Sequence, residues 1–120
     1  MACQKGHKDI VKMLLDKQAD INIQTVDGAT PLAFACHEGH KDIVKMLLDK
    51  QADVNTQNVD GATPLHTACH QGHKDIVKML LDKQADVNIQ AVGGVTPLAI
   101  ACHQGQEEIS GLLRQHGAIM

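Results

Sequence analysis

The stretch Asp60–Val92, DGATPLHTACHQGHKDIVKMLLDKQADVNIQAV, is a repeat unit of 33 residues. The preceding unit, Asp27–Val59, differs from it at only five pairs of positions: 33/66, 34/67, 38/71, 56/89 and 58/91. The later part of the unit recurs in Ala2–Val26, and its first part recurs in Gly93–Gly105. A fixed period of this size indicates stacked units, each of which buries its apolar face against the next.

Local signals within the unit predict two helices and a turn. Thr63 is a suitable N-cap, and Pro64 suits the first helical position. Gly72 can end this first helix in a left-handed conformation. Residues 73–83 carry a wide apolar stripe that predicts a second helix, followed by an extended stretch over residues 86–92. The dipeptide Asp60-Gly61 predicts a hairpin-like turn.

The motifs of the unit together resemble the ankyrin repeat. They are TPLH at 63–66, Ala68, GH at 72–73, LL at 80–81 and ADVN at 85–88. The resemblance implies an all-α ankyrin-repeat solenoid, in which stacked helix-turn-helix units carry hairpin-like finger loops. It divides the single domain, residues 1–120, into an N-terminal half repeat (1–26), two full repeats (27–59 and 60–92) and a C-terminal capping repeat (93–120).

The units differ at the two ends of the chain. The chain starts in mid-repeat, so we expect a fragment of a longer repeat protein or an engineered array. Its first helix, residues 7–17, keeps the apolar stripe of the internal units, which predicts either fraying or end-to-end self-association. Gly117 stands where the other units have Gln18, Gln51 and Gln84, and a left-handed backbone there would cost each glutamine about 1 kcal/mol relative to glycine.

The resemblance also implies a function and a contact surface. Ankyrin repeats bind partner proteins through a concave face of finger tips and inner helices, and the family's contact positions can be carried onto this chain. In the fingers these positions are Val26, Asp27, Ala29, Val59, Asp60, Ala62, Val92, Gly93 and Val95. On the inner helices they are Ala33, Phe34, His37, Glu38, His66, Thr67, His70, Gln71, Ala99, Ile100, His103 and Gln104. The TPLH histidine, His66, is in addition expected to tie neighbouring units together.

Composition argues against other classes of partner. The net charge is −3, and the lysines alternate with aspartates instead of forming a basic stripe, so we expect no nucleic-acid or membrane surface. The four cysteines lie one period apart, at 3, 36, 69 and 102. Stacked helices are about 8–10 Å apart, too far for disulfides between equivalent positions. Reduced, buried thiols predict an intracellular, cytoplasmic protein.

Catalytic and metal sites are weakly indicated. His66 and His70 lie four residues apart on one helix, a spacing that can hold zinc or nickel, but no further ligand is spaced to complete the shell. Adjacent Cys and His residues such as Cys69-His70 do not face each other on a helix. We therefore expect no enzyme and no cofactor.

Three functions remain open. The first is a scaffold that binds a specific protein partner. The second is a designed or consensus-like array with no selected partner, which the 28 identical positions of 33 in the two full units also favour. The third, a distant alternative, is metal binding through histidines.

Overall fold

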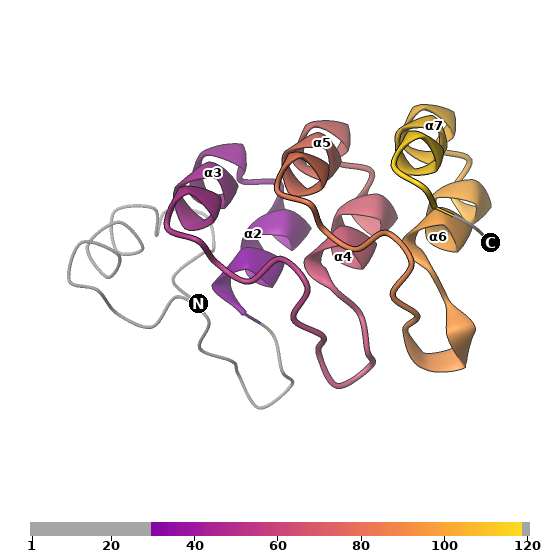
Figure 1. The fold of residues 1–120 in the computed structure, drawn as a ribbon, viewed down its shortest axis with the longest axis horizontal. Coiled ribbons are helices and arrows are strands. Elements are labelled where there is room, and N and C mark those ends of the chain that lie inside the picture. Colours follow the sequence, from indigo (N-terminus) through magenta and orange to yellow (C-terminus); the bar gives the residue numbers. More distant parts are fainter. Residues whose placement is uncertain (1–29, 119–120) are drawn as a thin grey trace.

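The computed structural model describes residues 30–118, and these form a stack of helix pairs in two rows (Figure 1). The inner row contains α2 (Pro31–Glu38), α4 (Pro64–Gln71) and α6 (Pro97–His103). The outer row contains α3 (Lys41–Asp49), α5 (Lys74–Asp82) and α7 (Glu107–Gln115). The loops that lead into α4 and α6 extend past the inner row, on the side opposite the outer row, and we call them fingers (Figure 1). This arrangement confirms the predicted all-α solenoid.

The inner helices begin in the same way in all three described repeats. Thr30, Thr63 and Thr96 are the N-caps, and proline follows each of them. Each threonine Oγ1 accepts a hydrogen bond from the backbone N–H three residues later, at 3.1–3.4 Å. The side chain thus satisfies an N–H that has no partner within the helix, which stabilises the helix by about 1 kcal/mol.

The core lies between the two rows and between successive repeats. In the central unit, Leu65, Ala68 and Cys69 of the inner helix are fully buried, as are Ile76 and Val77 of the outer helix. Burial raises the pKa of the Cys69 thiol to about 12, so this cysteine is a small neutral core residue, as predicted.

The expectation that the cysteines are buried is wrong for Cys102. Its side chain is exposed, while the equivalent Cys36 and Cys69 are buried. Among the described residues, no inner helix lies beyond α6 to cover it. Its sulfur instead lies 3.6 Å from Ser110 Oγ and accepts a hydrogen bond from Arg114 at 3.7 Å. No disulfide joins the cysteines of the described repeats.

Polar contacts connect each described repeat to the next. Asn55 Oδ1 accepts a hydrogen bond from the Asp86 backbone N–H at 2.9 Å, and Asn88 Nδ2 donates to the Gly117 carbonyl at 3.2 Å. Asp86 Oδ1 also accepts from the Asn88 N–H, which forms a local turn. The prediction of an extended stretch from residue 86 is therefore wrong at its start, because the Asp side chain competes for the backbone.

Ion pairs join the first turns of successive outer helices. Lys41 Nζ lies 3.1 Å from Asp75, and Lys74 pairs with Glu108 in the same way one repeat later. The lysines hold the pKa values of Asp75 and Glu108 below their ordinary range, and Glu108 raises the pKa of Lys74. The carboxylates contribute stability above their ordinary pKa values and lose it in acid. Because these pairs are exposed, salt screens them.

His66 connects α4 to the finger of the following repeat. Its Nδ1 accepts a hydrogen bond from the Thr63 backbone N–H at 3.0 Å, so the ring proton is on Nε2, which donates to the Val95 carbonyl at 3.0 Å. This bond confirms that His66 ties neighbouring units together. The equivalent positions carry Ala33 and Ala99, so His66 alone makes this tie among the described repeats.

Burial explains the protonation state of His66. Desolvation lowers the pKa of the ring below its ordinary value of 6.5, although hydrogen bonds to the backbone of Val95 and Ile89 oppose this effect. Protonation would also add a hydrogen to Nδ1, which would then face the Thr63 backbone N–H. The hydrogen bond that Nδ1 accepts from this N–H would be lost. The folded protein therefore holds His66 neutral.

We predict that mild acid weakens the stack through His66. Between pH 6.5 and the lower folded pKa, the unfolded chain binds a proton that the folded chain does not, so stability falls as the pH decreases. Melting temperatures measured between about pH 7 and pH 5 should fall more for the wild type than for His66→Gln. His70→Gln, at an exposed histidine, is the matched control and should behave as the wild type. Equal pH dependence in wild type and His66→Gln would contradict the prediction.

The outer helices end in a strained conformation. After α5, the Gln84 N–H donates to the Leu81 carbonyl and the Ala85 N–H donates to the Leu80 carbonyl, which requires a left-handed residue at the glutamine. Gln51 and Gln84 have φ values of 65° and 63°, as the comparison with Gly117 (φ 92°) predicted. A side chain in this region costs more than glycine because its Cβ crowds the carbonyl oxygen.

We predict that Gln84→Gly stabilises the protein by about 1 kcal/mol, which raises the melting temperature by roughly 4 °C. Gln51→Gly should do the same. Gln104→Gly is the matched control, because Gln104 has an ordinary right-handed φ of −82° and glycine there only increases the freedom of the unfolded chain. Stabilisation by Gln104→Gly and not by Gln84→Gly in thermal melts would overturn the assignment of strain.

Candidate protein-binding surface

The finger loops expose apolar side chains. Val59, Val92 and Val95 are 67%, 70% and 37% exposed, and all the large hydrophobic residues exposed in the described part of the chain lie in these loops. Val59 and Val92 occupy equivalent positions in successive repeats, so the exposed apolar surface recurs with the period of the stack.

Side-chain and backbone hydrogen bonds shape the first described finger. The Asn58 N–H donates to the Ala62 carbonyl, and the Gly61 N–H donates to the Asn58 carbonyl. Asn58 Oδ1 accepts from the backbone N–H groups of Asp60 and Ala62, at 2.9 and 3.0 Å. Gly61 has a φ of 77°, which confirms the turn predicted from Asp60-Gly61. These hydrogen bonds stabilise the tip that carries Val59.

The second described finger keeps the backbone bonds of the first but lacks its side-chain bonds, because Ala91 replaces the asparagine. The Ala91 N–H donates to the Val95 carbonyl at 2.7 Å in an isolated bridge, as the Asn58 N–H does to the Ala62 carbonyl. The short 3₁₀ turn η1 (Val92–Gly94) forms the tip. The Val92 N–H donates to the Asp60 carbonyl at 2.8 Å, so the two finger tips are bonded to each other. Sequence reasoning missed this bond, because neither partner uses its side chain.

The inner helices expose one row of side chains near their C-terminal ends. His37, His70 and His103 stand at equivalent positions near the ends of the helices and are exposed. The residues that follow them, Glu38, Gln71 and Gln104, are exposed as well. This row is polar, whereas the finger tips are apolar.

Most of the residues expected at a partner surface are accessible, with one exception. His66 is 2% exposed, and both its ring nitrogens are hydrogen-bonded within the protein. His66 is therefore not available to contact a partner. Val26, Asp27 and Ala29 lie outside the described residues. The residues that are partly exposed are Ala33, Phe34, Ala62, Thr67, Ala99 and Ile100. The residues that are exposed are His37, Glu38, Val59, Asp60, His70, Gln71, Val92, Gly93, Val95, His103 and Gln104.

Charge separates the two sides of the stack. Every lysine and arginine between residues 30 and 118 lies on an outer helix or at its C-cap, and these are Lys41, Lys45, Lys50, Lys74, Lys78, Lys83 and Arg114. The inner helices and the segments that lead to them carry only acidic formal charges, at Glu38, Asp53, Asp60 and Asp86. The described finger loops and inner helices therefore carry no lysine or arginine, while the outer helices carry charges of both signs.

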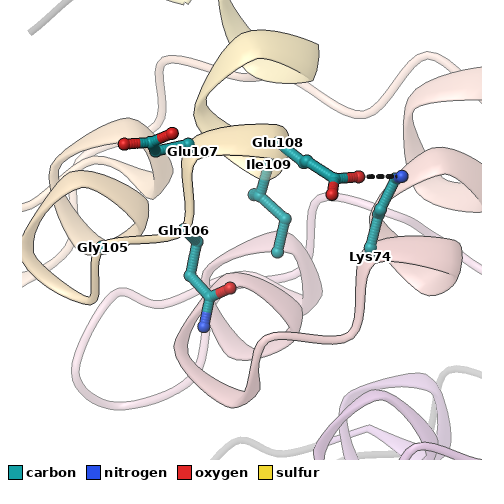
Figure 2. A pocket seen from close by; sticks show the side chains of 6 residues that line it. All are labelled: Lys74, Gly105, Gln106, Glu107, Glu108 and Ile109. Atoms are coloured by element: carbon teal, nitrogen blue, oxygen red, sulfur yellow. Dashed lines mark hydrogen bonds and ion pairs between the residues drawn. The ribbon is translucent and has the colours of Figure 1, made fainter.

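Grooves between the outer helices of successive repeats do not form a site of their own. One of about 440 Å³ is lined by Lys74, Gly105, Gln106, Glu107, Glu108 and Ile109. Figure 2 shows Lys74 and Glu108 pointing toward each other across it, so these two charges already satisfy one another. Within residues 30–118, no three His, Cys, Asp or Glu side chains gather in a way that could hold a metal ion.

None of the helices in the described part of the chain has the length and apolar character required to cross a bilayer.

The comparisons with known proteins agree with this architecture. The family model for ankyrin repeats, in three copies, matches residues 1–58 and 52–120. No curated protein is similar enough to the chain to count as a match. Ankyrin repeats are generally protein-interaction modules and are typically not enzymes. The family model covers the chain from end to end, and so the protein belongs to the ankyrin repeat family.

Proposed function

We propose that this protein is an intracellular, cytoplasmic interaction scaffold, which binds a partner protein through the face that its finger loops and inner helices share. We call this the finger face, and it consists of Val59, Asp60, Val92, Gly93 and Val95 with His37, Glu38, His70, Gln71, His103 and Gln104. The observation that carries the proposal is the exposure of Val59, Val92 and Val95.

The free energy lost by leaving these valines in water supports a role in binding. Covering a fully exposed valine stabilises a complex by about 1.5 kcal/mol or more, and a soluble protein obtains nothing from leaving it in water. The exposed valines recur on the fingers, which vary without disturbing the core.

The finger face is also held in place before a partner arrives. The Val92–Asp60 bond joins the tips, and His66 connects the last described finger to α4. A surface that is already ordered loses less conformational entropy on binding. This favours recognition through contacts at a fixed spacing.

The competing function is a designed or consensus-like array without a selected partner. Such an array has the same fold, and the same face would have no specific ligand. Metal binding through histidines has no geometric support in residues 30–118, where no candidate cluster occurs.

Paired substitutions on the two sides of the stack test the proposal. We expect Val59→Ser with Val92→Ser to abolish the saturable capture of a partner from cell lysate, because it removes apolar contacts from the finger face. Lys45→Ala with Lys78→Ala, at equivalent exposed outer-helix positions, should leave capture unchanged. All four side chains are exposed, so both double variants should keep the melting temperature of the wild type.

The outcomes separate the three functions. Capture that survives the finger substitutions and is lost with the lysine substitutions would move the site to the outer helices. If the wild type captures no partner at stoichiometric levels from any lysate, the protein is an array without a selected ligand. Calorimetric titration with zinc that shows stoichiometric binding would favour the metal function.

A further inference from the structure

The buried ring of His66 lies against both sides of the second described finger. Its Nε2 donates to the Val95 carbonyl at 3.0 Å, and the backbone of Ile89, on the other side of the same loop, also hydrogen-bonds the ring. The ring is 2% exposed. Moving residues 89–95 away from α4 would therefore open the ring to water.

This finger is held by fewer bonds than the first described finger. In the first finger, Asn58 Oδ1 accepts from two backbone N–H groups, and Ala91 cannot do this in the second. The bonds that tie the second finger to the preceding repeat include the one from His66 and the one from the Val92 N–H to the Asp60 carbonyl. The equivalent of His66 beside the first finger is Ala33, so a titratable ring supports only one of the two described fingers.

Burial, and not a neighbouring charge, governs the titration of His66. Its pKa is lowered by desolvation, and the opposing effects come from backbone hydrogen bonds. His66 lies in the first turn of α4, and residues 89–95 carry no titratable side chain. The titratable groups on α4 and on the described elements that pack against it lie in the last turns of the inner helices, on α5 or its N-cap, and at the first finger tip: Cys36, His37, Glu38, Cys69, His70, Cys102, His103, His73, Lys74, Asp75, Lys78, Asp82 and Asp60.

A proton on His66 disfavours the closed position of the finger. Thr63 Oγ1, 2.8 Å from Nδ1, can accept the new N–H, but the Thr63 backbone N–H then loses its acceptor. The cation also lacks the hydration that it has in water. When the finger moves away, the ring is hydrated and its pKa approaches the ordinary value of 6.5, above that of the closed state. Lowering the pH through this range therefore favours the open position.

We propose that the second described finger is a proton-operated switch, in which protonation of His66 moves residues 89–95 away from α4 while the helices stay packed. The movement breaks the Val92–Asp60 bond, so it displaces the valines of this finger relative to Val59. The switch goes beyond the proposed function, because it operates in the protein alone, with no partner present.

Amide hydrogen exchange of the whole chain, measured by NMR as protection factors, tests the switch. The reporters are the Thr63 N–H, which is bonded to His66, and the Val92 N–H, which is bonded to Asp60. Both protection factors should fall between pH 7.5 and pH 5.5 by up to about tenfold, because the open state binds a proton that the closed state does not. The Asn58 N–H, which is bonded within the first finger, should keep its protection.

Urea separates this local movement from unfolding of the stack. Low urea concentrations should leave the protection of Thr63 and Val92 unchanged, because moving a loop exposes little surface. They should lower the protection of Val77 in α5, whose N–H is bonded to the His73 carbonyl, because exchange there requires unfolding. If Thr63 and Val92 respond to urea as Val77 does, the helices do not stay packed and the switch is ruled out.

Two substitutions remove the switch or move it. His66→Ala, which restores the residue of the equivalent positions, should lower the protection of Thr63 and Val92 at pH 7.5 and abolish its pH dependence. His70→Gln, at an exposed histidine of the same helix, should behave as the wild type.

Ala33→His should transfer the pH dependence to the first finger. Thr30 caps α2 as Thr63 caps α4, and the Ala62 carbonyl is equivalent to that of Val95. The Thr30 N–H should therefore gain protection at pH 7.5 and lose it toward pH 5.5. Protection of Thr63 and Val92 that stays constant or rises in acid, or that falls equally in His66→Ala, would overturn the proposal.

Discussion

The packing of one repeat against the next is the constraint on which the described stack depends. A helix pair of this size cannot cover its own apolar face, so the buried leucines Leu32, Leu65 and Leu98, which are 0–1% exposed, require a neighbour on the stack. The inner helices touch each other more extensively than the outer helices do. Alanine at positions 35, 68 and 101, fully buried in each case, permits this close approach. With a single phenylalanine and no other aromatic residue, aliphatic side chains supply the core.

Polar contacts between repeats then position what the core leaves free. Asn55, Asn88 and His66 each bond to the backbone of the following unit, and the Val92–Asp60 bond joins the fingers. These bonds fix the loops without using the finger-tip side chains. The exposed side chains of Val59 and Val92 are consequently available to a partner, and they recur with the period of the repeats.

Near-identical units do not behave identically in the stack. Cys69 is a buried neutral thiol, while Cys102, one period later, is exposed and contacts Arg114. Gln84 and Gly117 both have a left-handed backbone, but only the glutamine, which has a Cβ, is strained by it. His66 makes a tie that Ala33 and Ala99 cannot make. Environment along the stack, and single substitutions within a constant pattern, account for these differences.

The sequence by itself determined the period, the helix pairs, their threonine caps and their glycine ends, because these depend on residues close together in the chain. It also predicted the left-handed glutamines and most of the accessible positions on the finger face, through the family pattern. Only the tertiary structure decided that His66 is buried, that Cys102 is exposed and that Asp60 and Val92 bond through their backbones. These three facts depend on which repeat lies alongside, and backbone contacts between repeats leave no mark on residue identity.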